Sequence, residues 1–202
     1  SHDGPQTPQL KINGQTLLAF CSNDYLGLAN HPVLIRAAQN ACVDYGLGSG
    51  ASHLVAGHTD VHHELEEALA KLTQRPRALL FSSGYMANMG VLSSLLDRQD
   101  AVYQDRLNHA SLLDGGLLSA AKFQRYRHQD LSDLQRQLDK TQARRHLVAT
   151  DAVFSMDGDT ALLKPLSQLC HAQQAWLMID DAHGFGVLGP DGGGSALAQG
   201  LT

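Results

Sequence analysis

The stretch LMIDDAHG at residues 177–184 decides the fold of this chain. Its first three residues end an apolar run, which predicts a buried strand, and two carboxylates, a histidine and a glycine follow within the next five residues. In an open α/β sheet the carboxyl ends of parallel strands open into the crevice where ligands bind. The pattern therefore places Asp180 at a strand tip beside such a crevice, although capping of the next turn explains a lone aspartate equally well.

The composition is that of a globular protein without a basic surface. The chain has 202 residues, of which 43% are hydrophobic and 17% charged, with a net charge of -5, so a nucleic-acid partner is not expected. No apolar run approaches the ~20 residues of a membrane-spanning helix, and residues 1–5 lack a signal-peptide pattern. We therefore expect a cytoplasmic protein with no membrane partner. Three widely spaced cysteines, Cys21, Cys42 and Cys170, indicate neither a disulfide framework nor a zinc site.

Strands and helices alternate along the chain, which predicts an α/β fold with a mainly parallel sheet flanked by helices. The expected strands are residues 16–20, 78–81, 101–103, 123–126, 147–150 and 176–179. The expected helices begin near residues 32, 60, 84, 112, 130 and 165. Residues 1–10 are expected to be a loose arm and residues 184–200 a loop. We accordingly divide the chain into an arm with a short strand, residues 1–30, and part of a large domain, residues 31–202.

Two polar segments have competing interpretations. The glycine-rich residues 46–52 suit either a close approach of the backbone to a ligand or a flexible connection. His58 and His62 lie four residues apart and invite a metal hypothesis, but no His-Glu-x-x-His motif is completed. We predict no metal site and interpret Thr59 and Asp60 as caps of the following helix.

The segment FSSGY at residues 81–85 predicts a strand, a Ser/Gly turn and the start of a helix. Free backbone N–H groups and the helix dipole converge at such a start, which can therefore bind an anion. A tight turn with a helix cap explains the same residues equally well.

Five motifs follow one another along the chain: NDYLGL at 23–28, FSSGYMAN at 81–88, NHAS at 108–111, FSMDGD at 154–159 and DDAHG at 180–184. Together they resemble the successive signatures of the α-oxoamine synthases. These are pyridoxal-phosphate enzymes with the aspartate-aminotransferase fold, also called fold type I. The resemblance extends from about residue 12 to the end of the chain.

The resemblance implies how four side chains would hold the pyridoxal 5'-phosphate ring, which acts as an electron sink for a substrate carbanion. Asp180 would pair with the pyridine nitrogen and keep it protonated. His183 and Ser155 would contact the 3-oxygen of the ring. His109 would stack on the ring face and lie close to the amino-acid substrate.

The resemblance also implies contacts with the cofactor phosphate and with the substrate. Gly84 and Tyr85 would offer backbone N–H groups to the phosphate at the helix start. Asn23 is a candidate contact of the substrate. Family members are homodimers, so a homodimer is expected.

Within the family, DRLNH at 105–109 and SMDGD at 155–159 favour a member of biotin biosynthesis. Such an enzyme condenses L-alanine with a pimeloyl thioester, carried by acyl carrier protein or CoA, and releases CO2. Relatives that join glycine to acetyl-CoA, or that use glycine or serine otherwise, stay as alternatives. A pocket that distinguishes alanine from glycine by one methyl group gains only about 1 to 3 kcal/mol.

One feature of the family is missing. Its Schiff-base lysine follows the Asp-x-x-His motif by some tens of residues, and this chain stops at Thr202. The lysines present are Lys11, Lys71, Lys122, Lys140 and Lys164, and none matches that position. We therefore expect a fragment of the large cofactor domain without the lysine or the C-terminal small domain, inactive on its own. A non-catalytic fragment that only binds a partner is the alternative.

Overall fold

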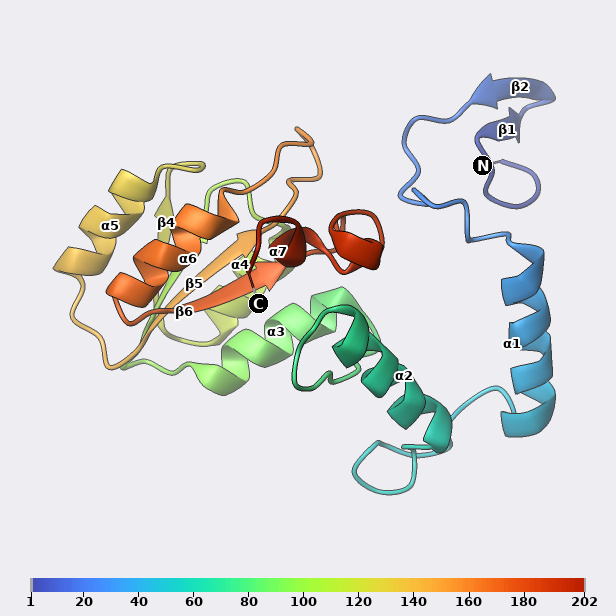
Figure 1. The fold of residues 1–202 in the computed structure, drawn as a ribbon, viewed down its shortest axis with the longest axis horizontal. Helices are drawn as coiled ribbons and strands as arrows, with labels where there is room; N and C mark the ends of the chain where they lie inside the picture. Colours follow the sequence, from blue (N-terminus) through green and yellow to red (C-terminus); the bar gives the residue numbers. More distant parts are fainter. Residues whose placement is uncertain (1, 202) are drawn as a thin grey trace. The chain divides into compact units, whose positions relative to one another are not determined.

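The structure is a computed structural model that describes residues 2–201. The chain forms two compact units, and the division between them lies between Leu65 and Glu66 (Figure 1). The division expected at residue 30 stays a prediction. Among residues 2–201, no helix has the length and apolarity needed to cross a membrane.

The N-terminal unit begins with a two-stranded hairpin. Strand β1 (Gln9–Ile12) pairs antiparallel with β2 (Gln15–Leu18). The turn between them is Asn13-Gly14, with φ angles of 50° and 78°, the left-handed values that favour this dipeptide in a two-residue hairpin. The prediction that residues 1–10 are a loose arm is therefore wrong at its end, because β1 starts there.

Helix α1 (Pro32–Tyr45) follows the hairpin and starts as predicted, with a proline in its first turn. It ends at Gly46, whose φ of 79° a glycine adopts without strain. None of its side chains is buried. Helix α2 (Asp60–Leu72) also begins at the predicted residue.

The C-terminal unit is built on a four-stranded sheet. Its strands are β3 (Ala101–Asp105), β4 (Lys122–Tyr126), β5 (His146–Asp151) and β6 (Trp176–Asp180). They lie in the order β4-β3-β5-β6, and every neighbouring pair is parallel. The prediction of a parallel sheet is confirmed.

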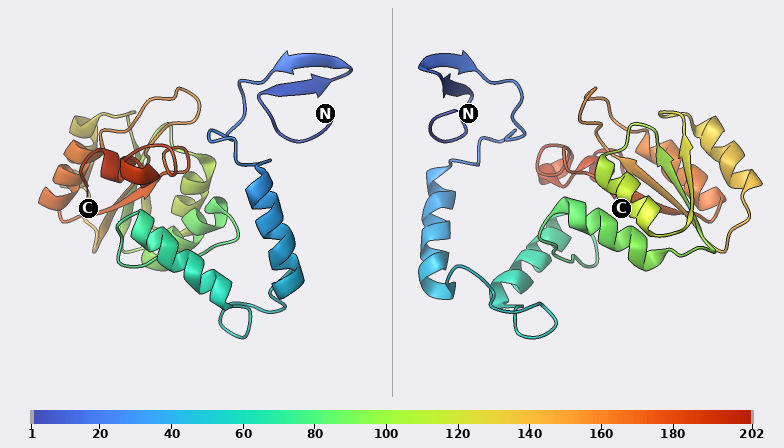
Figure 2. Two further views of the ribbon diagram at one scale, coloured as in Figure 1. Left: turned by 45° about the vertical axis from the view of Figure 1, so that its right-hand side comes forward. Right: turned by 180° about the vertical axis from the view of Figure 1, so that it is seen from behind.

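Helices cover both faces of this sheet (Figure 2). Helices α3 (Gly84–Leu95) and α4 (Ala110–Leu118) pack together on one face. Helices α5 (Leu131–Lys140) and α6 (Leu163–Ala172) pack on the other. Helix α5 begins near residue 130 as predicted, and Asp130 is its N-cap, since the Asp130 side chain accepts from the N–H of Asp133.

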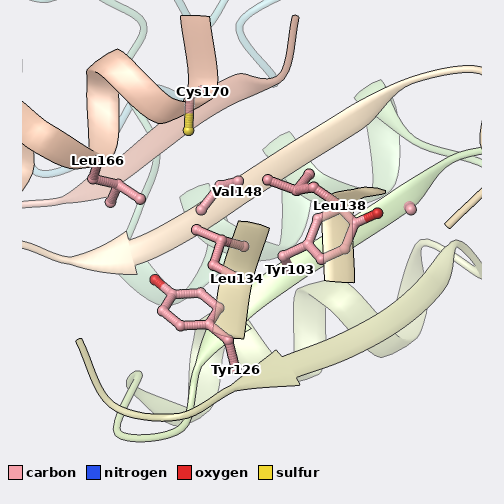
Figure 3. Close-up of a cluster of buried hydrophobic side chains, with 8 residues drawn as sticks. Tyr103, Tyr126, Leu134, Leu138, Val148, Leu166 and Cys170 are labelled. Carbon is pink, nitrogen blue, oxygen red and sulfur yellow. The ribbon is translucent and has the colours of Figure 1, made fainter. Parts of the chain in front are cut away.

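The core is divided between the two faces because successive strand residues point in opposite directions. Tyr103 and Val148 lie in the cluster under α5 and α6, where they meet Leu134 (Figure 3). Val102 lies in the cluster on the opposite face, together with Leu92 of α3. The strands are thus packed against helices on both faces of the sheet, which also fixes the positions of the carboxyl ends of the strands.

The order of the strands creates a switch point between β3 and β5. The chain passes from β3 outward to β4, then returns to the other side of β3 to form β5 and β6. In open α/β sheets a crevice for ligands opens at the carboxyl ends of the strands at such a point. The topology therefore predicts that residues directly after β3 and β5 line a ligand-binding site.

Two predictions for this unit are wrong. Residues 78–81 form no strand, because no strand among the described residues pairs with them. Leu79 is 74% exposed, and the N–H of Leu80 donates to the Glu66 carboxylate at 3.2 Å. The expected loop at residues 184–200 contains the 3-10 turn η1 (Pro190–Gly192) and the short helix α7 (Ser195–Ala198).

Candidate active site

The ends of β3 and β5 are tied together by Asn108. Its Nδ2 donates to the carbonyl oxygen of Ala149 at 2.8 Å, and its Oδ1 accepts from the N–H of Asp151 at 3.1 Å. The N–H of His109 donates to Oδ2 of Asp151 at 2.9 Å. These bonds fix the start of α4 against the end of β5, so the position of His109 is set by the sheet.

Asp151 is a buried carboxylate at this edge. Its pKa is raised to about 6, chiefly by burial and also by the nearby charge of Asp180, while the hydrogen bond from the His109 N–H opposes this rise. Asp151 and Asp180 are register partners at the ends of β5 and β6. A cation bound beside two such carboxylates would stabilise their charged forms.

The first turn of α3 presents an open helix N-terminus. The Ser83 side chain accepts from the N–H of Met86 at 3.2 Å, so Ser83 is the N-cap. The N–H groups of Gly84 and Tyr85 have no acceptor within the helix. A Cβ atom added at Gly84 would meet nothing within 4 Å, so an anion can approach these groups. The cap is therefore compatible with the predicted anion site, which stays a prediction.

Hydrogen bonds connect Asp180 to His109 through two buried side chains. Nδ2 of Asn88 lies 2.6 Å from Oδ2 of Asp180 and 2.9 Å from Oγ of Ser111. Oγ of Ser111 lies 2.8 Å from Nδ1 of His109. The second Asp180 oxygen, Oδ1, accepts from the N–H of Ala182 at 3.1 Å. The carboxylate and the imidazole are therefore parts of one network.

The imidazole of His109 also lies beside the start of α3. The rings of Tyr85 and His109 are 6.2 Å apart between centroids and meet edge to face. The Tyr85 hydroxyl donates to the Asp114 carboxylate, and this hydrogen bond raises the pKa of Tyr85. The helix start, His109 and Asp180 thus converge from α3, α4 and β6.

Ser155 and His183 follow the ends of β5 and β6. Ser155 is exposed in the turn after Phe154, and His183 is partly buried three residues after Asp180. The loop of Ser155 is anchored by His128, whose Nδ1 and Nε2 lie 2.9 Å from Asp105 and 2.8 Å from Asp159. Contacts of Ser155 and His183 with a cofactor stay predictions.

The network leaves Asp180 available for a cationic ligand. Its two oxygens accept from Asn88 and Ala182, and within residues 2–201 no lysine or arginine pairs with it. A partly buried carboxylate without a cation fits the protonated ring nitrogen of pyridoxal phosphate. The open N-terminus of α3 fits the phosphate of the same molecule.

The C-terminal unit also contains a cavity that lies elsewhere. A cavity of about 660 Å³ is lined by residues that include Leu177, Ile179 and Asp181. Since strand residues alternate, these side chains leave β6 on the face opposite to that of Asp180. The cavity is therefore separate from the network described above.

The N-terminal unit contains the remaining candidates. Asn23 is exposed, and its Oδ1 accepts from the Tyr25 hydroxyl at 3.3 Å, so its substrate contact stays a prediction. The N–H of Thr59 donates to Nδ1 of His62 at 3.2 Å, and the capping of α2 by the side chains of Thr59 and Asp60 stays a prediction. Nδ1 of His53 lies 3.0 Å from Nδ1 of His58, a contact that the sequence did not suggest.

Sequence reasoning missed Asn88, Ser111 and Asp151. Asn88 and Ser111 each lie inside a quoted motif, but a helical position gives no sign of which distant side chain it meets. Asp151 directly follows a predicted strand, and this position was a signal for a site residue.

The comparisons with known proteins agree with this geometry. The model of the family described as aminotransferase class I and II matches residues 15–199. The chain belongs to this family. An 8-amino-7-oxononanoate synthase from Cellvibrio japonicus is 64% identical over 197 residues, which are 98% of this chain and 50% of that protein. The chain spans about half the length of the curated relatives it matches.

Solved structures of the same fold confirm the predicted fold class. A serine palmitoyltransferase from S. paucimobilis superposes with a TM-score of 0.92 at 33% identity, over 96% of this chain and 49% of that one. An 8-amino-7-oxononanoate synthase from Francisella tularensis superposes with a TM-score of 0.76 at 36% identity, over 90% of this chain and 50% of that one. The resemblance to the α-oxoamine synthases and to the large domain of fold type I enzymes is therefore confirmed.

Proposed function

We propose that the protein containing this chain is an 8-amino-7-oxononanoate synthase that uses pyridoxal phosphate. The reaction joins L-alanine to a pimeloyl thioester, carried by acyl carrier protein or CoA, and releases CO2 and the thiol. One observation carries the proposal: the carboxylate of Asp180, the imidazole of His109 and the start of α3 converge at the switch point of the sheet. The identity of 64% to a synthase with this name supports the choice within the family.

Each group at the crevice has a role in holding the cofactor. Bound pyridoxal phosphate supplies an electron sink for the α-carbon of the amino acid. Asp180 would pair with the ring nitrogen and keep its proton in place. The N–H groups of Gly84 and Tyr85 would bind the phosphate, and Ser155 and His183 would donate to the 3-oxygen.

His109 would act on the ring face and on the amino acid. Its imidazole is exposed, while its backbone N–H is held by Asp151. A fixed ring of this kind can cover one face of a flat heterocycle and exclude water from it. It would also lie next to the carboxylate of the amino acid, and Asn23 would contact the substrate.

A second member of the family is the main alternative. Serine palmitoyltransferases are among the structures that superpose well, with a TM-score of 0.92. Their identity to the chain is 33%, about half of that to the curated synthases. Glycine with acetyl-CoA is the third pairing, because a pocket that distinguishes two amino acids by one methyl group gains only about 1 to 3 kcal/mol.

The decisive experiment is a matrix of substrates offered to the full-length protein that contains this chain. Alanine, glycine and serine are each combined with pimeloyl-CoA, acetyl-CoA and palmitoyl-CoA, and the aminoketones are identified by mass spectrometry. We expect the alanine–pimeloyl pair to give the highest kcat/KM. A preference for glycine with acetyl-CoA or serine with palmitoyl-CoA would assign the protein to another member. Absence of product from every pair would contradict the proposal.

We further propose that the protein is a homodimer. Large apolar side chains of the N-terminal unit are exposed, among them Phe20 (93%), Leu47 (94%) and Leu54 (99%). Apolar side chains exposed to this degree favour burial against another chain, and symmetric pairs are the commonest oligomers. Light scattering of the full-length protein after size-exclusion chromatography tests this, with a dimer mass as the expected result.

A further inference from the structure

We propose that Asn88 and Ser111 are positioning residues that fix His109 as the tautomer with its proton on Nε2 and connect it to Asp180. The catalytic meaning of this assignment rests on the proposed function, but the assignment itself concerns hydrogen bonds within this chain. Neither residue would touch the cofactor through its side chain. Both would act through the groups that do.

The direction of each hydrogen bond follows from the chemistry of the two ends. An ionised carboxylate only accepts, so the amide atom that faces Oδ2 of Asp180 must be the donor Nδ2 of Asn88. The same Nδ2 carries a second hydrogen, which reaches Oγ of Ser111 at 2.9 Å. The Ser111 hydroxyl therefore accepts from Asn88 and keeps its own proton to donate.

The other end fixes the proton of the imidazole. The backbone N–H of Ser111 lies 3.2 Å from Nδ1 of His109, and a backbone N–H can only donate. Nδ1 must therefore present its lone pair, which also accepts from the Ser111 hydroxyl at 2.8 Å. In the neutral ring the proton then lies on Nε2. His109 thus presents an N–H donor, and not a lone pair, to a molecule bound at the crevice.

Burial makes the arrangement rigid. Asn88 is 6% exposed and Ser111 1% exposed, so water has little access to replace either hydrogen-bond partner, and loss of a bond would cost free energy. Gly115 lies one turn after Ser111 on α4, and a Cβ atom there would come within 2.9 Å of the Asn88 carbonyl oxygen. The close approach of α3 and α4 that brings Ser111 to Asn88 therefore depends on this glycine.

The primary test measures the tautomer directly in the wild-type protein, and a variant is used only to assign the signals. Solid-state ¹⁵N spectra are recorded on full-length protein labelled at histidine nitrogens, and the His109 signals are identified by their loss in H109Q. We expect an unprotonated Nδ1 and a protonated Nε2 at pH values where the ring is neutral. A proton on Nδ1, or an even mixture of tautomers, would overturn the proposal. The result does not depend on which substrates the enzyme uses.

Variants test the roles of the two residues. Ser111→Ala removes the hydroxyl donor and Asn88→Leu removes the link to Asp180 at similar size. In S111A only the longer bond from the backbone N–H, at 3.2 Å, still donates to Nδ1 of His109. We therefore expect the fraction of His109 with its proton on Nε2 to fall in S111A and to recover in S111T, which keeps a hydroxyl. We expect N88L to bind pyridoxal phosphate about tenfold more weakly in an absorbance titration, since a buried bond to a charged group is lost.

Controls separate positioning from a general loss of structure. Ser93 lies on α3 and is exposed, and its hydroxyl donates to backbone carbonyl oxygens of the same helix. Ser93→Ala is therefore the control, and it should change neither readout. Circular dichroism reports whether each variant folds. An unchanged tautomer in a folded S111A, or unchanged cofactor affinity in a folded N88L, would remove that residue from the proposed role.

Discussion

Asp151 of β5 and Asp180 of β6 are register partners, so two carboxylates end adjacent parallel strands at one edge of the sheet. Asp151 is 6% exposed, and burial together with the charge of Asp180 raises its pKa to about 6. The charges of the two carboxylates repel each other at this edge. A cationic ring bound beside Asp180 would reduce this repulsion.

The first prediction concerns Asp151→Asn and pH. Because the pKa of Asp151 is higher in the folded than in the unfolded state, the folded state binds more protons between about pH 4 and pH 6, and its stability falls as the pH rises through this range. The substituted amide could still accept from the N–H of His109 but would not titrate. The difference in unfolding free energy between the variant and the wild type, from urea denaturation, should therefore grow in favour of the variant from about pH 4 to pH 6. A constant difference would contradict this prediction.

The second prediction concerns His128→Gln. Burial lowers the pKa of His128, but its hydrogen bonds to Asp105 and Asp159 outweigh this and leave the pKa raised above 6.5. The stabilisation by charged His128 is then complete below about pH 6.5 and is lost as the pH rises through the folded-state pKa. The variant should be destabilised more at about pH 6 than at about pH 8 in thermal unfolding. An equal loss of thermal stability at both pH values would show that the contacts of His128 with Asp105 and Asp159 are not ionic.

The third prediction concerns Gly115→Ala. The added Cβ atom would lie 2.9 Å from the Asn88 carbonyl oxygen and 3.0 Å from Cδ1 of Leu92. Helices α3 and α4 must then separate, at a cost of about 1 to 3 kcal/mol in unfolding free energy. Urea denaturation measures this cost. Gly48→Ala is the control, because a Cβ atom at Gly48 meets nothing within 4 Å, and it should cost much less.

The fourth prediction concerns Asp180→Asn in the full-length protein. The variant keeps an oxygen that can accept from Asn88 but loses the charge that would face the ring nitrogen. We expect pyridoxal phosphate to bind about ten- to a hundredfold more weakly in a fluorescence titration. Asp191→Asn is the control, since Asp191 is exposed and its φ of 54° is also accessible to asparagine. Equal affinities of D180N and D191N would argue against the role of Asp180.

The sheet was predictable because each strand carries its own pattern. The apolar runs that end in Asp151 and Asp180 identify strands and their functional ends without knowledge of their neighbours. The hairpin at Asn13-Gly14 was also readable, because this dipeptide is a strong local signal for a two-residue turn. The prediction of a loose arm over residues 1–10 did not include this turn.

Other parts depend on partners that a linear sequence does not name. Residues 78–81 have the composition of a strand, yet no described strand pairs with them, so composition alone was insufficient. The link from Asn88 to Asp180 joins residues 92 positions apart, and only the packing of α3 against the sheet reveals it. Motif membership of Asn88 indicated importance without indicating the contact.

The two borders of the sheet differ in chemistry. The outer strand β4 carries Lys122, Gln124 and Arg125, whereas β6, which has a neighbour on one side only among residues 2–201, begins with Trp176 and continues as an apolar run. Unpaired N–H and C=O groups along an apolar strand are a template for pairing between molecules, and charged borders resist it. When it is expressed by itself, the chain should therefore form aggregates through β6. Light scattering would follow the growth of these aggregates. Met178→Lys should slow this growth. Strand β6, which positions the carboxylate of Asp180 at one end, thus also has an edge that must be covered to prevent aggregation.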